Sequence, residues 1–191
     1  VAALYIIAGY KRSRAVSYFP MLLFAAAVYT VGFYREILSD SAQTAETIRL
    51  VSYGGIIFMP AFCLLFAMQL VEKPCPKSLK AALYGFSSAL YLMLLSNSAH
   101  HLFYRSIASY INAYGYRILT TEKGPLFFVL LLYIGFSIIY STVIISKTVR
   151  SVKLNKRRVV SLHFVLVSLQ IPWLAILATL AGLDKTADLA P

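Results

Sequence analysis

The sequence predicts an all-α membrane protein, a polytopic bundle of transmembrane helices with a small β-hairpin in one connection. Hydrophobic residues make up 60% of the 191 residues and charged residues only 13%, whereas a soluble domain carries about 25% charged residues. Five stretches without Asp, Glu, Lys or Arg are long enough, or nearly so, to cross a bilayer. The basic residues gather in alternate connections. One bundle accounts for the whole chain, so we expect a single domain.

The uncharged stretches mark the expected spans, because a charge at the centre of a bilayer costs about 2.5–3.5 kcal/mol on insertion scales. Residues 1–10 look like the second half of a span, and no basic segment precedes them as in a signal peptide. We therefore expect a truncated first helix there and six membrane segments in total. The expected helices cover residues 1–10, 15–38, 48–71, 79–97, 125–146 and 159–183.

The distribution of charge predicts the orientation of this bundle. Twelve basic residues and one acid lie in the connections after the first, third and fifth segments, so the whole net charge of +11 lies on one side. By the positive-inside rule these connections are cytoplasmic and the N-terminus is outside. We interpret the basic residues as anchors to anionic lipid. The expected partner is therefore the bilayer, and we do not expect the chain to bind nucleic acid. These twelve basic residues are Lys11, Arg12, Arg14, Lys73, Lys77, Lys80, Lys147, Arg150, Lys153, Lys156, Arg157 and Arg158.

The long connection over residues 98–124 predicts an extracytoplasmic β-hairpin. Two β-prone stretches, Tyr104–Ile111 and Tyr116–Thr121, flank the turn signal Asn112-Ala113-Tyr114-Gly115. The predicted orientation places this hairpin over the outer mouth of the bundle. Its tyrosines have two possible roles. They could belong to a functional loop on a rigid scaffold, or they could anchor the chain at the membrane interface.

No pattern in the sequence indicates an enzyme or a metal site. It has neither a phosphate-binding glycine loop nor two histidines at i, i+4 with a carboxylate. No Asp or Glu inside a span suggests a proton relay. The two cysteines, Cys63 and Cys75, would lie roughly 18 Å apart along a helix, which is too far for a disulfide. We expect two free thiols, no catalytic residue, no metal and no cofactor.

Polar and aromatic residues gather at the predicted outer ends of the helices, where they could form a small-molecule pocket. Arginine and tyrosine are also ordinary anchors at helix ends, so the structural interpretation stays open for each. Pro60 and Pro172 lie near the middle of two spans and are candidate hinges, although kinks at proline are frequent in ordinary membrane helices. The candidate ligand-binding residues are Tyr34, Arg35, Arg49, Tyr53, Asn97, His100 and Trp173.

Three stretches carry recognisable motifs. The first, Tyr53–Pro60, contains two glycines and a proline and is followed by an apolar run. The second is Gly124-Pro125, which precedes two phenylalanines. Ser96–Phe103 resembles an Asn-Pro-x-His-x-Leu-Phe motif in which Ser98 replaces the proline. Together they resemble the N-terminal seven-transmembrane sensor region of bacterial histidine kinases, which also precedes diguanylate cyclase modules. The resemblance runs from about Phe19 to the end of the chain.

This resemblance implies a sensory input domain in the bacterial inner membrane, with a cytoplasmic kinase or cyclase module in cis as its partner. In the family a seventh helix leads to that module, and we expect this helix to be missing here. The resemblance also implies a homodimer, and a small molecule, a lipid or an envelope state as the signal. Asn97 and His100 match the loop motif, but the resemblance assigns them no role.

Two other classes of membrane protein are alternatives. Buried ion pairs, interrupted helices and inverted repeats are typical of a small transporter or channel-like bundle. The sequence predicts none of these features. A rhodopsin-like photoreceptor needs a Schiff-base lysine in a helix core, and none of the uncharged stretches holds one. They are Val16–Tyr34, Leu50–Val71, Ala81–Leu95, Leu126–Ser146 and Val159–Leu183.

Overall fold

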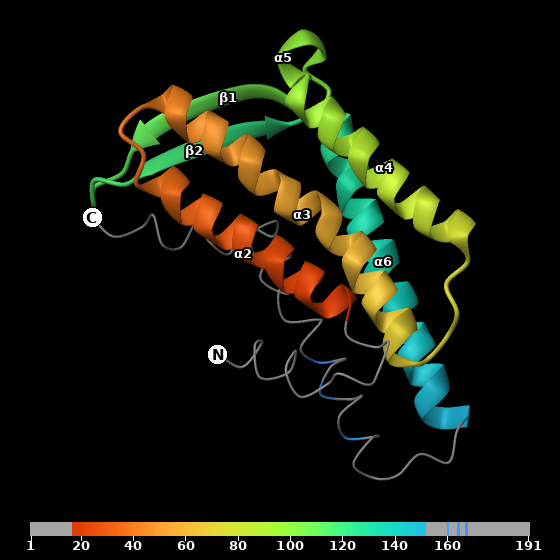
Figure 1. Ribbon diagram of the computed structural model, residues 1–191. Coiled ribbons are helices and arrows are strands. Elements are labelled where there is room, and N and C mark those ends of the chain that lie inside the picture. The colour runs from red at the N-terminus through yellow and green to blue at the C-terminus, as the bar shows by residue number, and fades with distance from the viewer. Residues whose placement is uncertain (1–16, 152–159, 161–163, 165–166, 168–191) are drawn as a thin grey trace.

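The computed structural model describes residues 17–151 together with Val160, Phe164 and Val167. The expected helix over residues 1–10, most of the one over 159–183, Pro172 and Trp173 lie outside the described residues. The described part holds four long helices, one short helix and a β-hairpin (Figure 1). In chain order these are α2 (Tyr18–Ile37), α3 (Ala42–Leu70), α4 (Lys77–Leu95), α5 (Asn97–His100), β1 (Tyr104–Ile111), β2 (Arg117–Lys123) and α6 (Pro125–Ser151).

Three helices of the described part, α3, α4 and α6, are long and apolar enough to cross a membrane. The 20-residue helix α2 is not among them. The prediction of a helical membrane protein is confirmed to this extent, and the total of six segments stays a prediction.

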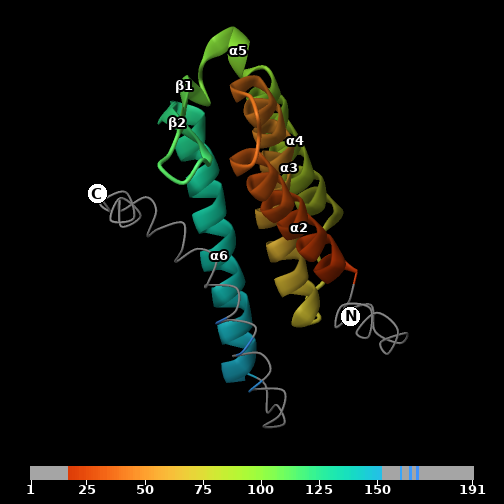
Figure 2. The same ribbon diagram turned by 90° about the vertical axis from the view of Figure 1, so that its left-hand side faces the viewer.

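Helix α3 is the centre of the described bundle, and it packs against α2, α4 and α6. Figures 1 and 2 show α2 and α3 running side by side in opposite directions, with α6 on another side of α3. In lipid, close packing of side chains holds helices together, since the lipid tails are as apolar as the core itself. The most deeply buried core side chains include Ile57, Leu64, Leu65, Leu94 and Leu130.

Two glycines allow α2 and α3 to approach closely. A Cβ atom at Gly55 would lie 2.3 Å from the carbonyl oxygen of Ala25, and one at Gly32 would lie 2.3 Å from Cβ of Ser52. Both positions have neighbours that belong to the facing helix and leave no room for a methyl group. Small residues serve the same purpose at other helix contacts in membranes.

We expect Gly55→Ala to lower the free energy of unfolding by about 1–3 kcal/mol, because the added methyl group forces the two backbones apart. The matched control is Gly85→Ala in α4, where no described residue outside the adjoining turns of α4 lies within 4 Å of the added Cβ. That control should be neutral or stabilise the chain by up to about 1 kcal/mol, since alanine is the better helix former. Denaturant unfolding in bicelles measures both, and equal effects would contradict the close contact.

Two helices extend beyond their expected bounds. Helix α3 starts at Ala42 instead of residue 48, because Ser41 caps it and its Oγ accepts a hydrogen bond from the Thr44 N–H (3.1 Å). Helix α6 continues to Ser151 instead of ending at residue 146, since Lys147 and Arg150 are good helix formers that leave the bilayer without breaking the helix. Helix α3 also continues through Pro60 without interruption.

The predicted hairpin is confirmed, with β1 antiparallel to β2 and Tyr110 opposite Ile118. Its second strand is shifted, and it runs from Arg117 to Lys123 instead of Tyr116–Thr121. Asn112 organises the turn, because its Oδ1 accepts hydrogen bonds from the N–H groups of Tyr114 (3.1 Å) and Tyr116 (2.9 Å). Gly115 has a φ of 81°, a conformation that glycine adopts without strain.

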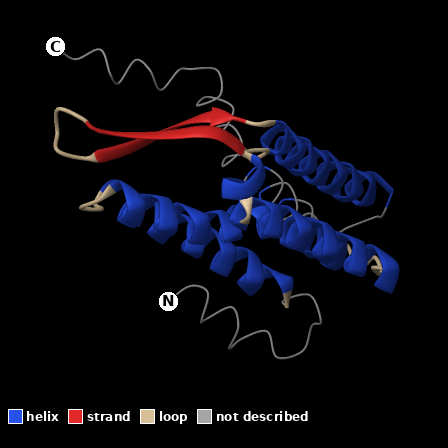
Figure 3. Ribbon diagram, turned by 90° about the horizontal axis from the view of Figure 1, so that it is seen from above, coloured by secondary structure: helices blue, strands red, loops and turns tan. Residues whose placement is uncertain are grey.

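The hairpin connects the α4–α6 side of the bundle to the α2–α3 connection (Figures 1 and 3). At its base, the N–H of Gly124 donates to the Phe103 carbonyl (2.9 Å) and the N–H of Leu126 to the Leu102 carbonyl (3.0 Å). Near its tip, Arg117 donates to the carbonyls of Ser39 (3.1 Å) and Asp40 (2.8 Å). We call this end of the bundle the hairpin end.

Candidate ligand site at the hairpin end

A buried ion pair joins α2 to α3 beneath the hairpin. Arg49 donates from Nε to both carboxylate oxygens of Glu36 (3.1 Å each) and from Nη2 to Glu36 Oε1 (2.5 Å). The side chains of Arg49 and Glu36 are only 12% and 5% exposed. Arg49 Nη2 also donates to the Leu119 carbonyl of β2 (3.0 Å). One guanidinium group therefore links two helices and the hairpin.

This ion pair corrects the expectation that the chain has no buried ion pair. At the end of α2 the sequence analysis selected Arg35, which is exposed, whereas its neighbour Glu36 is the buried residue. A signal for Glu36 was present. It follows Gly32 by four residues and Tyr29 by seven, a spacing that places all three on the face toward α3.

Aromatic side chains continue this polar cluster toward β1. The ring of Tyr53 in α3 meets the ring of Tyr104 edge to face, with 5.9 Å between centroids. Tyr104 is only 2% exposed, and its buried hydroxyl makes no hydrogen bond to any residue of the described part. Phe103 and Phe127 pack against the same ring, at 5.4 and 6.2 Å between centroids. Tyr104 thus brings an unused hydroxyl group into an otherwise closed cluster.

Burial raises the pKa of Tyr104 above its ordinary value of 10.0, and the nearby Tyr53 raises it further. The folded chain therefore keeps this phenol proton at a pH where the unfolded chain loses it, so stability should fall above pH 10 by up to about 1.4 kcal/mol per pH unit. Unfolding measured at about pH 9 and 11 tests this. Tyr104→Phe should reduce the alkaline loss, whereas Tyr110→Phe on the exposed part of β1 should leave it unchanged.

Asn97 holds the start of the hairpin. Its Oδ1 accepts hydrogen bonds from the N–H groups of Phe103 (2.8 Å) and Tyr104 (3.0 Å), and its Nδ2 donates to the Tyr104 carbonyl (3.0 Å). The side chain is buried and bonds three backbone groups of the hairpin. The amide group of asparagine is both donor and acceptor, so it suits this position.

His100 stabilises the same loop from the other side. Its Nδ1 accepts a hydrogen bond from the Leu102 N–H (3.0 Å), and its Nε2 lies 3.3 Å from Ser96 Oγ. His101 follows in the left-handed conformation, with φ 54°, which turns the chain from α5 into the hairpin. These contacts give the loop motif a structural basis.

A cavity of about 140 Å³ lies beside this cluster, between α3, the end of α4, α5 and β1. Its walls are mainly apolar. The residues with polar side chains in its lining are Glu46, Arg49, Asn97, Ser98 and Tyr104. The complete lining is Glu46, Arg49, Leu50, Leu94, Leu95, Asn97, Ser98, Tyr104 and Ile107.

The structure brings together some of the predicted ligand residues and leaves others apart. Arg49 and Asn97 line the cavity, and Tyr53 contacts Tyr104 in its wall. Tyr34 is 62% exposed on α2, and Arg35 beside it is exposed as well. His100 lies one turn away in α5, and Trp173 lies outside the described residues. Glu36, Glu46 and Tyr104 were not among the predicted ligand residues.

Among the described residues, no group of His, Cys, Asp and Glu side chains could hold a metal ion. Cys63 is buried and Cys75 is partly exposed, and both are free thiols. The described part of the hairpin end therefore offers hydrogen bonds, charge and apolar contact to a ligand. These are the interactions by which proteins bind small molecules.

Comparison with known proteins places the chain in a family. The model of the N-terminal 7TM region of histidine kinase matches residues 1–191. No curated protein and no solved structure matches the chain. That family region is the sensory input part of histidine kinases and is not itself catalytic, in agreement with the spans, the hairpin and the loop motif described above. The chain belongs to the family of N-terminal 7TM regions of histidine kinases.

Proposed function

We propose that this chain senses a small molecule, a lipid or an envelope state at the hairpin end and relays the signal to a cytoplasmic module in cis. That module would be a histidine kinase or a diguanylate cyclase. Tyr53, Arg49 and Asn97 would contribute to the ligand site, with Tyr34, Arg35, His100 and Trp173 as further candidates. The complete receptor would act as a homodimer in the bacterial inner membrane.

The observation that carries this proposal is the link made by Arg49. Its guanidinium group binds Glu36 of α2 and the backbone of β2 at once. A ligand that displaces the hairpin would therefore also shift the packing of α2 against α3. Because α3 contacts every other long helix of the described part, such a shift would reach the opposite end of the bundle, with Pro60 and Pro172 as candidate hinges.

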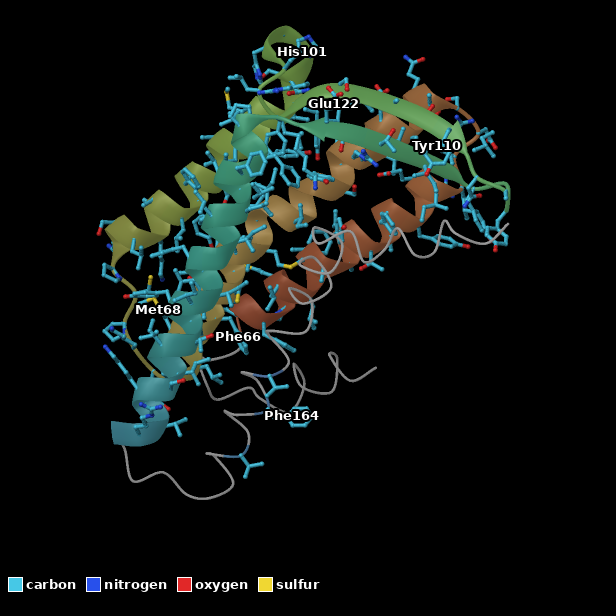
Figure 4. All side chains as sticks on the ribbon, turned by 180° about the vertical axis from the view of Figure 1, so that it is seen from behind. Phe66, Met68, His101, Tyr110, Glu122 and Phe164 are labelled. Atoms are coloured by element: carbon cyan, nitrogen blue, oxygen red, sulfur yellow. The ribbon has the colours of Figure 1, made fainter. Side chains whose placement is uncertain are left out.

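The proposed orientation puts the hairpin end outside the cell. Of the basic connections predicted to be cytoplasmic, the one with Lys73, Lys77 and Lys80 lies at the opposite end of α3 and α4. Figure 4 shows the same separation, with Glu122 and Tyr110 at the hairpin end and Met68 toward the other end of α3. A signal received at the hairpin would then travel the thickness of the membrane.

Signalling of this kind requires that the ligand bind one packing of the helices better than the other. A shift from 1:99 to 99:1 takes about 5.5 kcal/mol of differential affinity. The hairpin contacts are of a suitable size, since a hydrogen bond to a charged group is worth about 1.5–3 kcal/mol. Loss of a few such contacts would move the equilibrium.

The test measures autophosphorylation in nanodiscs of a receptor that joins this chain to its kinase module. Arg117→Ala removes the contacts between the hairpin and the α2–α3 connection, and it should change the basal rate at least threefold in either direction. The matched control is Arg105→Ala, an exposed arginine on β1, which should leave the rate unchanged. If both variants behave like wild type, the hairpin does not control the kinase and the proposal fails.

A small transporter or channel is the second candidate, because the buried pair of Glu36 and Arg49 is a feature expected of that class. The pair lies at the ends of α2 and α3, where it joins elements of the fold. We therefore assign it to the sensor. Substrate-dependent flux through liposomes that contain the chain alone would favour the transporter instead.

A further inference from the structure

We propose that the cavity at the hairpin end binds a small molecule that carries one ammonium group on an apolar body. This inference rests on the proposed sensory function, since it names the chemical class of the signal. It follows from the size of the cavity, from its lining residues and from Glu46, the charged lining residue without an ion-pair partner among the described residues.

The size and the walls set the apolar part of the ligand. A cavity of about 150 Å³ holds one molecule of the size of benzene, and this one measures about 140 Å³. Four of its nine lining residues have aliphatic side chains, namely Leu50, Leu94, Leu95 and Ile107. Burial of one ring or a short branched chain against these side chains would supply the apolar contact.

Charge in the lining selects the polar part of the ligand. Arg49 is neutralised by Glu36, and the amide group of Asn97 bonds three backbone groups of the hairpin. The half-buried carboxylate of Glu46 forms no salt bridge with any residue of the described part. The group available to a ligand is thus an anionic acceptor.

Two further features favour a cation. Helix α4 ends at Leu95 in the cavity wall, and a helix C-terminus carries a partial negative charge of roughly half an elementary unit. Tyr104 is one of the lining residues, and aromatic rings attract ammonium groups.

The probe is benzylammonium, which combines one ring with one ammonium group, and the protein is the chain in nanodiscs. Equilibrium dialysis at pH 7 should show saturable binding to wild type beyond that to empty nanodiscs, whereas benzoate and benzyl alcohol should bind at least tenfold more weakly. Glu46→Gln should weaken binding of benzylammonium at least tenfold. The matched control is Glu122→Gln, the same change on the exposed side of the hairpin, which should bind like wild type.

Equal binding of the three probes, equal effects of the two glutamine variants or no saturable binding would each overturn the assignment. Ile107→Trp, which fills the cavity from a half-exposed position, separates this failure from that of the proposed function. If benzylammonium does not bind but Ile107→Trp alters kinase autophosphorylation at least threefold, the sensor proposal stands and only the ligand class is wrong. If the kinase also fails to respond to both Ile107→Trp and Arg117→Ala, the sensor proposal falls too.

Discussion

Arg49→Met is expected to lower the free energy of unfolding by about 3–5 kcal/mol, the largest effect of any substitution considered. The change leaves the Glu36 carboxylate, 5% exposed, buried without its partner, and an uncompensated buried charge costs about this much. It also removes the hydrogen bond to the Leu119 carbonyl. Methionine keeps the length and apolar contacts of the side chain, so the loss reports the charge and not a cavity.

The control removes both charges at once. In the double variant Glu36→Leu with Arg49→Met no charge is left unpaired, and such replacements are often neutral or even stabilising. We therefore expect it to recover most of the lost stability, measured by denaturant unfolding in bicelles. A double variant no more stable than Arg49→Met would mean that the two side chains do not act as a pair.

Asn97→Ala is expected to cost about 2–4 kcal/mol, because it leaves the amide groups of Phe103 and Tyr104 and the Tyr104 carbonyl without their partner. Each unsatisfied buried group costs about 1–3 kcal/mol, and relaxation of the loop recovers part of that sum. Asn97→Asp should cost at least as much, since aspartate keeps the acceptor for both N–H groups but buries a carboxylate whose second oxygen faces the Tyr104 carbonyl.

Hydrogen exchange identifies the cause of that loss. In Asn97→Ala the amide protons of Phe103 and Tyr104 should exchange much faster, whereas in Ser98→Ala, at the exposed neighbouring position, they should exchange as in wild type. Unchanged protection in Asn97→Ala would show that the asparagine does not hold the hairpin.

The hairpin, and three residues that lie in or beside the candidate cavity, could be predicted from the sequence because the signals for them are local. A turn such as Asn112–Gly115 depends on its own side chains and on the backbone freedom of Gly115. Arg49, Tyr53 and Asn97 were selected because polar and aromatic residues gather at the predicted outer ends of the helices.

The residues that were missed depend on which face of a helix meets its neighbour. Arg35 and Glu36 are equivalent in a search for polar groups at helix ends, and only packing of α2 on α3 distinguishes the exposed one from the buried one. Tyr104 looked like one tyrosine among several in an outer loop, and its burial arises from contacts with α3 and α6.

The start of α3 and the end of α6 differ from the predicted bounds for another reason. A search for uncharged stretches finds the apolar part of a span, yet α3 begins at Ala42 and α6 runs to Ser151, both beyond that part. Polar and charged residues continue a helix wherever the backbone hydrogen bonds continue. Capping residues such as Ser41 mark the start of a helix better than hydropathy does.

The orientation of the hairpin end is the central claim, and labelling of single cysteines in whole cells tests it most directly. In a background with Cys63 and Cys75 replaced by serine, Tyr114→Cys at the hairpin tip, 72% exposed in the native chain, should react with a membrane-impermeant maleimide in intact cells. Lys73→Cys in the opposite connection should react only after the membrane is permeabilised. Labelling of Lys73→Cys in intact cells, with protection of Tyr114→Cys, would invert the topology and remove the proposed route for the signal.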